Sequence, residues 1–440
     1  MGSTPWRRLL PMLIAGGFSI LGCGGGGSGG EESGGGSSAV SGDLQVVRDE
    51  GLGDDGAEAV ALDSSGRILV AGYATNSSGN KDVAIWRLTS DGALDSSFGT
   101  GGIVTIAGSA GGDDLAHAIA VDSSGQILVA GETKGSSYID AALWRLEEDG
   151  DIDSTFGSSG LKTLAGLRDD IARDLEIQSD GMIVVVGYAK YTTTDMIVWR
   201  VKSDGSALDS TFGSGGVRFY TSGYGNDYAL GVALDSSGRI LVAGDVSTST
   251  GDFDMALVRL TTAGALDTTF GSGGVVTHNG AAGGSGYDYA LDVAVDSSGR
   301  IVVVGGSSNG SSDDLAVWRF GSTGALDTTF GGSGYVTAGN LAGGTGAEAA
   351  EAVVLDSSGR IVVAGSSSNG TDRDIVILRF DSTGSLDSSF DSDGARVVSN
   401  VAGTGNDEAY GLAIDSSGRM VISGYGVNGS GNRDMLLLRY

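Results

Sequence analysis

The chain is poor in several residue types that other protein classes need. Its 440 residues include one cysteine, two prolines and two histidines. One cysteine excludes an internal disulfide, and two histidines exclude a metal site built from several imidazoles. Both prolines precede residue 12, so the rest of the chain must form its turns with its 80 glycines and with Asp, Ser and Asn. The composition therefore indicates a protein rich in tight turns.

Positive charge is also scarce. The chain has 26 Lys and Arg residues against 55 Asp and Glu residues, which gives a formal net charge of −29. Phosphate groups would be repelled by this charge, which excludes nucleic acid as a partner. Cationic ligands or metal ions are favoured instead. The simpler explanation is an acidic surface that only keeps the protein soluble.

No apolar run is long enough to cross a membrane as a helix. The longest, residues 9–21, has thirteen residues and follows two arginines, which is typical of a signal peptide. The stretch 20–23 (Ile-Leu-Gly-Cys) resembles a bacterial lipobox, and this resemblance implies cleavage before Cys23 and acylation of its thiol. We therefore expect a signal peptide at 1–22 and contact with the membrane through a lipid anchor only.

Residues 23–42 are expected to be the lipidated cysteine followed by a flexible tether, because nearly all of them are Gly or Ser. The residue directly after the cysteine is Gly24 rather than Asp. In this respect the chain resembles lipoproteins that are sent to an outer membrane. We therefore expect the protein in the cell envelope, at the outer membrane or the cell surface.

One unit is repeated seven times in the rest of the chain. The glycine that ends each Asp-x-x-Gly turn recurs at steps of 59, 56, 57, 61, 60 and 59 residues. These glycines are Gly66, Gly125, Gly181, Gly238, Gly299, Gly359 and Gly418. A period this regular predicts a repeat architecture over residues 43–440.

Each copy contains four short stretches rich in Val, Ile and Leu, here named strands A to D. In the first copy they are 57–62, 67–72, 83–88 and 103–105. Four-stranded units repeated seven times predict an all-β, seven-bladed β-propeller of antiparallel blades. Residues 44–47 correspond to a strand D, and the seventh copy has only strands A to C. We therefore expect the N-terminal strand to complete the last blade, whereas an open β-solenoid remains the alternative fold.

Several columns of identical residues across the copies are predicted to be structural. The glycine of each A–B turn suits a positive φ, and the glycine within strand B suits a close approach of a neighbouring strand. A phenylalanine in each Leu-Asp-x-x-Phe stretch is expected to fill the gap between blades, and the tryptophans of strand C are expected in the core. An arginine at the end of strand C is expected to pair with Asp63 or Asp95 and their equivalents.

The two faces of the predicted ring differ in sequence. The A–B turns and C–D segments are nearly constant among the copies, and we call their side the constant face. The B–C and D–A loops vary in length and content, and we call their side the variable face. Loops on a rigid scaffold are the usual place for binding, so we expect the ligand on the variable face.

One variable column stands out at the second position of strand A, near the ring axis, beside small residues. Unselected variation is the plainer interpretation, and a ring of ligand contacts is the functional one. The candidate ligand-binding residues are Glu58, His117, Arg173, Leu230, Leu291, Glu351 and Tyr410.

Two acidic columns border the same face. Carboxylates at a strand start commonly accept backbone N–H groups, whereas oxygen ligands at this density could also hold Ca²⁺. No other cofactor is expected. The weak candidate metal ligands are Asp55, Asp114, Asp170, Asp227, Asp288, Glu348 and Asp407.

Catalysis has little support in the sequence. His117 and His278 are the two histidines, and both occupy positions that other copies fill with unrelated residues. No Ser-His-Asp set and no phosphate-binding loop followed by a helix is evident, so no catalytic residue is assigned. The rim carboxylates leave one enzymatic alternative, a carbohydrate-active or other hydrolytic propeller.

The pattern Ala-Val-x-x-Asp-x-x-Gly-Arg-Ile, followed by Leu-Asp-x-x-Phe-Gly, resembles the delta-60 repeat family of bacterial tandem-repeat proteins over residues 55–440. The resemblance implies a β-propeller in an extracytoplasmic setting and carries no known activity. We therefore expect a monomeric, lipid-anchored, non-enzymatic binding or scaffold module for a protein, peptide or glycan of the cell envelope.

Overall fold

The computed structural model describes residues 44–50, 53–108, 111–135, 137–164, 166 and 168–440. The predicted signal peptide, Cys23 and the tether lie outside the described residues. These described residues form one compact unit. Among the described residues, no helix is long and apolar enough to span a membrane.

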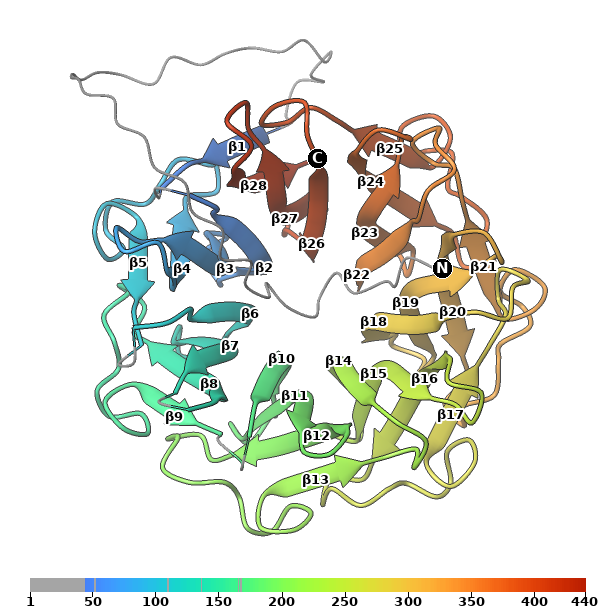
Figure 1. The fold of residues 1–440 in the computed structure, drawn as a ribbon, viewed down its shortest axis with the longest axis horizontal. Coiled ribbons are helices and arrows are strands. Elements are labelled where there is room, and N and C mark those ends of the chain that lie inside the picture. The colour runs from blue at the N-terminus through green and yellow to red at the C-terminus, as the bar shows by residue number, and fades with distance from the viewer. Residues whose placement is uncertain (1–43, 51–52, 109–110, 136, 165, 167) are drawn as a thin grey trace. The chain divides into compact units, whose positions relative to one another are not determined.

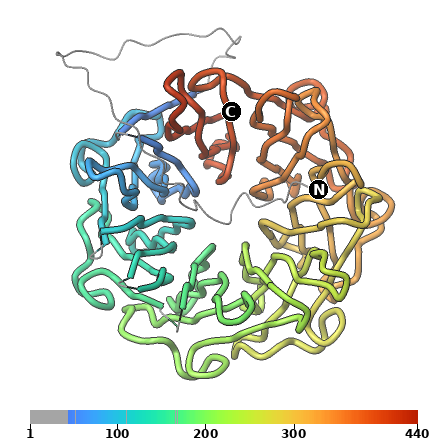
Figure 2. The backbone as a smooth tube through the Cα atoms, viewed as in Figure 1, coloured from blue at the N-terminus to red at the C-terminus, as the bar shows by residue number. Residues whose placement is uncertain are grey.

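Residues 44–440 fold into seven four-stranded antiparallel sheets arranged around a common axis, which is the predicted seven-bladed β-propeller (Figure 1). The backbone runs once around the ring from blade to blade (Figure 2). The innermost strands, A, are β2 (Gly56–Leu62), β6 (Leu115–Val121), β10 (Asp170–Ile177), β14 (Asp227–Leu234), β18 (Asp288–Val295), β22 (Ala349–Leu355) and β26 (Asp407–Ile414).

The remaining strands follow outward in each blade. The B strands are β3 (Ile68–Thr75), β7 (Ile127–Lys134), β11 (Ile183–Lys190), β15 (Ile240–Ser247), β19 (Ile301–Ser308), β23 (Ile361–Ser368) and β27 (Met420–Val427). The C strands are β4 (Lys81–Leu88), β8 (Ile139–Leu146), β12 (Thr194–Val201), β16 (Phe253–Leu260), β20 (Asp313–Phe320), β24 (Arg373–Phe380) and β28 (Arg433–Arg439). The D strands are β5 (Ile103–Ile106), β9 (Leu161–Thr163), β13 (Val217–Tyr220), β17 (Val275–His278), β21 (Tyr335–Ala338), β25 (Ala395–Val398) and, for blade 7, β1 (Leu44–Arg48).

The ring closes as the sequence predicts. Strand β1 pairs antiparallel with β28, with Leu44 opposite Arg439 and Arg48 opposite Met435. Figure 1 shows the blue β1 beside the red strands of the last blade. Because blade 7 is built from the two ends of the folded region, pairing of β1 holds blades 7 and 1 together.

The core consists of the layers between blades. Strands B and C are almost entirely buried, and their Val, Ile and Leu side chains meet those of the next blade. Trp86, Trp144, Trp199 and Trp318 are 0–4% exposed, which confirms their predicted place in the core. The strand B prediction began one residue early and ended three residues too soon, because pairing with strand C continues to Thr75.

The constant glycines have the predicted roles. All seven A–B turn glycines have positive φ, for example +77° at Gly66. A Cβ at Gly72 would lie 1.9 Å from the carbonyl oxygen of Gly56 in the neighbouring strand. This glycine therefore permits the close approach of strands A and B near the axis.

Five of the six constant phenylalanines, from Phe98 to Phe330, are fully buried between blades. Each lies beneath the C–D turn glycine of the next blade, as Phe98 does beneath Gly150. Phe390 is only half-buried, because blade 7 has no C–D turn among the described residues to cover it. At the junction of blades 7 and 1, Leu44 takes the phenylalanine's place beneath Gly92.

Candidate functional site

Each innermost strand begins with a β-bulge, and the bulged residue is the predicted ligand-binding residue. In blade 1, Ala57 pairs with Gly72 and Ala59 pairs with Ala71, so Glu58 has no partner opposite it. A bulge bends the strand and redirects the side chain. The same shift occurs at His117, Arg173, Leu230, Leu291, Glu351 and Tyr410. We call these seven residues the mouth of the ring; they belong to strands that surround the axis, near the variable face.

The mouth side chains are partly accessible rather than free on the surface. Arg173 and Leu291 are buried, at 5% and 8% exposure, and the other five are half-buried. A ring of seven side chains of five kinds on a rigid scaffold can present several polar and apolar contacts to one ligand. The bulges were not predicted, because a bulge depends on pairing that a single strand's sequence does not show.

An aromatic and cationic cluster occupies the mouth at blades 7 and 1. The Arg433 guanidinium lies 4.2 Å from the centre of the Tyr425 ring, and the Tyr410 ring lies 5.8 Å from the same ring. Tyr410 donates its hydroxyl to Glu408 Oε2 at 3.1 Å. Tyrosine and arginine are the residues that contribute most at binding surfaces.

The cluster continues into blade 1 through Tyr73. The Lys81 Nζ lies 4.0 Å from the centre of its ring. Burial, together with the charge of Glu58, raises the pKa of Tyr73 to about 12, so its hydroxyl stays protonated and able to donate. This part of the mouth therefore contains hydroxyl groups, cations and carboxylates side by side, with Tyr73, Tyr425 and Glu408 buried beneath it.

His117 lies in a second polar cluster at blades 2 and 3. Its Nε2 is 3.8 Å from Glu132 Oε2. Burial and the nearby charge of Arg173 lower the pKa of His117, although Glu132 acts in the opposite direction. The imidazole is therefore neutral at pH 7 and can serve as one donor and one acceptor.

An aromatic row extends over blades 3 to 5 on the variable face. Ring centres of Tyr188 and Tyr228 are 5.1 Å apart, those of Tyr228 and Phe253 are 6.0 Å apart, and those of Phe253 and Tyr287 are 5.5 Å apart. Sequence reasoning missed this row because its members come from different strand positions. The only signal was that each of these positions varies among the copies.

Two carboxylates inside the ring were also missed. Asp174 accepts the N–H of Val232 in the next blade at 2.7 Å, and Asp292 accepts that of Val353 at 2.8 Å. Burial and then the charge of Asp292 raise the pKa of Asp174 well above its usual value. These acids replace small residues of other copies and bond one innermost strand to the next.

The first acidic column forms hydrogen bonds to the backbone. All seven residues are at most 1% exposed. Asp55 accepts the N–H of Glu50 at 2.7 Å and that of Thr75 at 3.0 Å, and Glu348 accepts the N–H of Asn340 at 3.0 Å. Equivalent bonds from the D–A loop reach Asp114, Asp170, Asp227, Asp288 and Asp407. These contacts support the capping interpretation.

Burial also raises the pKa of several of these acids. The pKa of Asp170 rises to about 6, and those of Glu348 and Asp407 rise to about 7. Within the described part of the chain, no three His, Cys, Asp or Glu side chains gather in a geometry that could hold a metal ion. Calcium binding by this column stays a prediction.

The constant face is held together by arginines. Arg87 Nε donates to Asp95 Oδ2 at 2.9 Å, so the strand C arginine pairs with Asp95 rather than Asp63. Asp63 pairs instead with Arg67 of its own turn at 2.5 Å. The guanidinium of Arg87 also lies 4.6 Å from the centre of the Phe98 ring.

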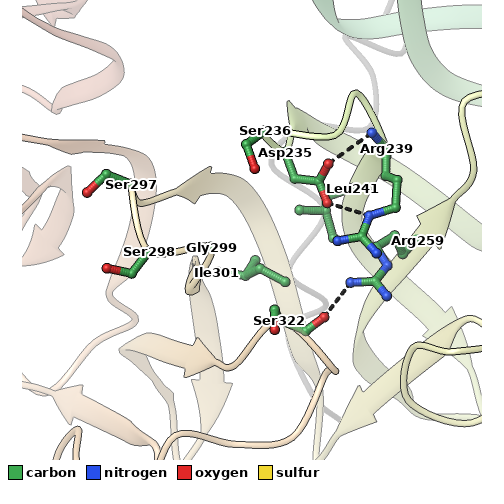
Figure 3. A pocket seen from close by; sticks show the side chains of 10 residues that line it. All are labelled: Asp235, Ser236, Arg239, Leu241, Arg259, Ser297, Ser298, Gly299, Ile301 and Ser322. Carbon is green, nitrogen blue, oxygen red and sulfur yellow. Dashed lines mark hydrogen bonds and ion pairs between the residues drawn. The ribbon is translucent and has the colours of Figure 1, made fainter.

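Two crevices open on the constant face rather than at the mouth. One, between blades 4 and 5, has a volume of about 200 Å³. Figure 3 shows Arg239 bonded to Asp235, and Arg259 reaching toward Ser322 of the neighbouring blade. An equivalent crevice of about 110 Å³ lies between blades 1 and 2. Because their linings are mainly turn residues that recur in most copies, these crevices follow from the repeat itself.

Six stretches of the chain match a family model described as a domain of unknown function (DUF5122) beta-propeller. The matches cover residues 64–98, 123–156, 178–212, 236–270, 297–330 and 357–390. Each runs from an A–B turn to the constant phenylalanine, so each contains strands B and C of one blade. Among curated protein sequences, none matches this chain.

Solved structures with similar folds are distant in sequence. A protein of unknown function from Dyadobacter fermentans is 13% identical, with 91% of this chain and 99% of that one covered and a TM-score of 0.46. A catalytically inactive virginiamycin B lyase from Staphylococcus aureus, bound to quinupristin, is 11% identical, with 90% and 99% covered and a TM-score of 0.45. The polysaccharide lyase Uly1 is 9% identical, with 87% and 89% covered and a TM-score of 0.47. The six family matches and the seven four-stranded blades together identify the chain as a repeat β-propeller protein.

Proposed function

We propose that this chain is a non-enzymatic binding module that takes a protein, peptide or glycan of the cell envelope at the mouth of its ring. The observation that carries the proposal is the seven β-bulges, which place one variable side chain from every blade beside the axis. The scaffold is constant and the residues at the bulges differ, which is how a rigid fold presents a specific surface.

The chemistry of the mouth suits a polar ligand with hydroxyl or amide groups. At blades 7 and 1, the half-buried Tyr410 and Arg433 supply an aromatic ring and a cation, and the buried Tyr425 and Glu408 hold them in place. Aromatic faces bind the apolar side of a sugar ring or a peptide side chain, while the polar groups fix its orientation.

A hydrolytic enzyme is the alternative, and the raised pKa values of Glu348 and Asp407 are what favour it. However, one oxygen of each carboxylate already accepts a backbone N–H group of its own loop. They are also spread one to a blade. The binding module is therefore the function that the geometry supports better.

The test is ligand capture by the purified full chain on a glycan array and a peptide library, followed by affinity measurement for each hit. We expect Tyr410→Phe and Arg173→Gln to weaken binding about tenfold, since each removes a hydrogen-bonding group with little change of volume. Arg300→Gln, in an exposed turn of the constant face, is the matched control and should bind as the wild type does. Equal affinity of all three variants, or no hit on either library, would overturn the proposal.

The proposed setting is a lipid-anchored protein of the delta-60 repeat family at the outer membrane or cell surface. Cys23 and its flanking residues support the anchor, although they lie outside the described residues. Labelling with a fatty-acid analogue should mark the wild type and leave Cys23→Ser unlabelled in the soluble fraction. An unlabelled wild type would refute the anchor without affecting the proposed binding site.

A further inference from the structure

In six blades the strand C arginine binds an aspartate of its own C–D segment. Its Nε donates to the aspartate Oδ2 at 2.6–2.9 Å in every case. The pairs are Arg87 with Asp95, Arg145 with Asp153, Arg200 with Asp209, Arg259 with Asp267, Arg319 with Asp327, and Arg379 with Asp387. In these six blades, the arginine at the end of strand C therefore binds an aspartate carboxylate.

Two further groups complete the arrangement. In blades 1, 4 and 6 the A–B turn arginine also approaches this carboxylate; in blade 6, for example, Arg360 Nη1 lies 3.2 Å from Asp387 Oδ2. The hydroxyl of the residue two positions after the aspartate donates to it, as Ser389 Oγ does to Asp387 Oδ1 at 2.7 Å, and accepts from Arg379 Nη2 at 2.8 Å. The bound motif is therefore Asp-x-Ser or Asp-x-Thr, held by the strand C arginine in all six blades and by the turn arginine as well in three of them.

Among the described residues, blade 7 has both arginines and no equivalent of this motif. Strand β1 occupies the D position, and among the described residues no C–D segment follows β28. Arg439, the strand C arginine, is 7% exposed, and its Nε has no hydrogen-bond partner. Arg419, the turn arginine, keeps its bond to Asp415 at 2.6 Å.

The charges around Arg439 do not replace the missing aspartate. Burial and the charge of Arg419 lower the pKa of Arg439, against the opposing effects of Asp415 and Asp91. Asp415 is bound by Arg419, and Asp91 accepts the hydroxyl of Thr89. A buried guanidinium N–H without an acceptor destabilises the protein, so a carboxylate placed there would be bound favourably.

We propose that Arg439 and Arg419 form a carboxylate-binding site for a partner peptide that presents Asp-x-Ser or Asp-x-Thr. The site lies on the constant face, away from the mouth, and does not depend on the proposed function. The six intramolecular copies show the geometry that the peptide would adopt. An aromatic residue is not required, because Leu44 already fills the position beneath Gly92.

The experiment measures fluorescence anisotropy of a labelled, acetylated and amidated peptide with the sequence of residues 92–99, Gly-Ala-Leu-Asp-Ser-Ser-Phe-Gly, added to the full chain. We expect saturable binding that weakens as salt increases, and at least about tenfold weaker binding of the peptide with Asn in place of Asp. Equal binding of both peptides, or no binding of either, would overturn the proposal.

Two variants locate the site. Arg419→Gln should weaken binding about tenfold. Arg360→Gln is the matched control in blade 6, where Asp387 already fills the equivalent position, and it should leave binding unchanged. A thermal melt of each variant shows that it is folded. Equal effects of the two substitutions would place the peptide elsewhere and refute the assignment.

A third variant separates a partner peptide from the chain's own acidic segment. Glu31 and Glu32 precede β1 in the sequence and lie outside the described residues. The double variant Glu31→Gln, Glu32→Gln should bind the peptide as the wild type does. Binding that becomes about tenfold tighter would show that the chain fills its own site, which would overturn the assignment to a partner.

Discussion

Arg439 donates from its Nη1 to the carbonyl oxygen of Ser90, a residue 349 positions earlier in the chain. The bond repeats one that other neighbouring blades make, such as Arg259 Nη1 to Ser322 O and Arg319 Nη1 to Ser382 O at 2.6 Å. The junction between blades 7 and 1 therefore uses the same contact as junctions within the continuous repeat. Ring closure combines this contact with the pairing of β1 and β28.

Removal of β1 should open this junction. A chain that begins at residue 49 loses the fourth strand of blade 7 and Leu44 beneath Gly92. We expect its thermal midpoint to fall by about 10 °C or more, whereas a chain that begins at residue 43 should melt like the full chain. Calorimetry of both truncations measures this. Equal midpoints would mean that the ring does not depend on β1.

The constant phenylalanines should differ in their contribution to stability. Phe330 is fully buried beneath Gly384, whereas Phe390 is half-buried. We expect Phe330→Ala to cost about 3–5 kcal/mol and Phe390→Ala about 1–2 kcal/mol, because burial sets the loss. Urea unfolding of the two variants gives the comparison, and equal costs would contradict the role of the next blade's turn.

Two glycines should respond differently to alanine. A Cβ at Gly244 would lie 1.8 Å from the carbonyl oxygen of Tyr228, so strands A and B would have to separate. We expect Gly244→Ala to cost about 3 kcal/mol. At Gly238, φ is +73° and the one atom near an added Cβ is Thr262 Cγ2, at an ordinary contact distance of 3.5 Å, so Gly238→Ala should cost only about 1 kcal/mol. The difference between their urea midpoints tests the explanation.

Stability should fall between pH 5 and pH 8. Burial raises the pKa of Glu176, Glu348 and Asp407 to about 7 in the folded chain, so the folded state holds protons that the unfolded state has released. Folding is therefore favoured below the unfolded pKa values, and this contribution is lost as the pH rises through 7. Thermal melts across this range measure the slope.

At acidic pH the stability should change in the opposite direction, falling as the pH falls. Hydrogen bonds from Ser389, followed by the charge of Arg379, lower the pKa of Asp387 to about 2, so its contribution is lost as the pH falls below 4. Maximum stability is expected near pH 4–5. The double variant Glu348→Gln, Asp407→Asn should show a shallower decline from pH 5 to pH 8. An unchanged slope would mean that these two acids do not carry it.

Calcium should have little effect on stability. The carboxylates of Asp55 and Glu348 already accept backbone N–H groups, so a bound ion would have to displace those bonds. We expect the melting temperature in millimolar Ca²⁺ and in chelator to agree within about 1 °C. A larger rise with Ca²⁺ would show preferential binding to the folded state and would support the metal site.

The sequence predicts the ring well because the residues that each blade needs recur in seven copies of the unit. Gly66 and Gly72 have the conformational roles expected of them. Residues 44–47 pair with strand C of blade 7, as expected because the seventh copy has only strands A to C. Periodicity predicts what is common to all blades, such as strand order, turn chemistry and core positions.

The contents of the mouth could be predicted only in part. Repeat alignment identified the position of Glu58 and its equivalents, but the bulge arises from pairing between strands. The aromatic row from Tyr188 to Tyr287 and the bond from Asp174 to Val232 join different blades and different columns. Such contacts depend on three-dimensional neighbours that a comparison of copies does not reveal.

The pairing of β1 with β28 also means that the covalent break need not fall where it does. Since β1 and β28 are held together by hydrogen bonds, a peptide link between strands C and D is dispensable in blade 7. A circularly permuted chain, joined between β28 and β1 and opened between strands C and D of another blade, should assemble the same seven blades.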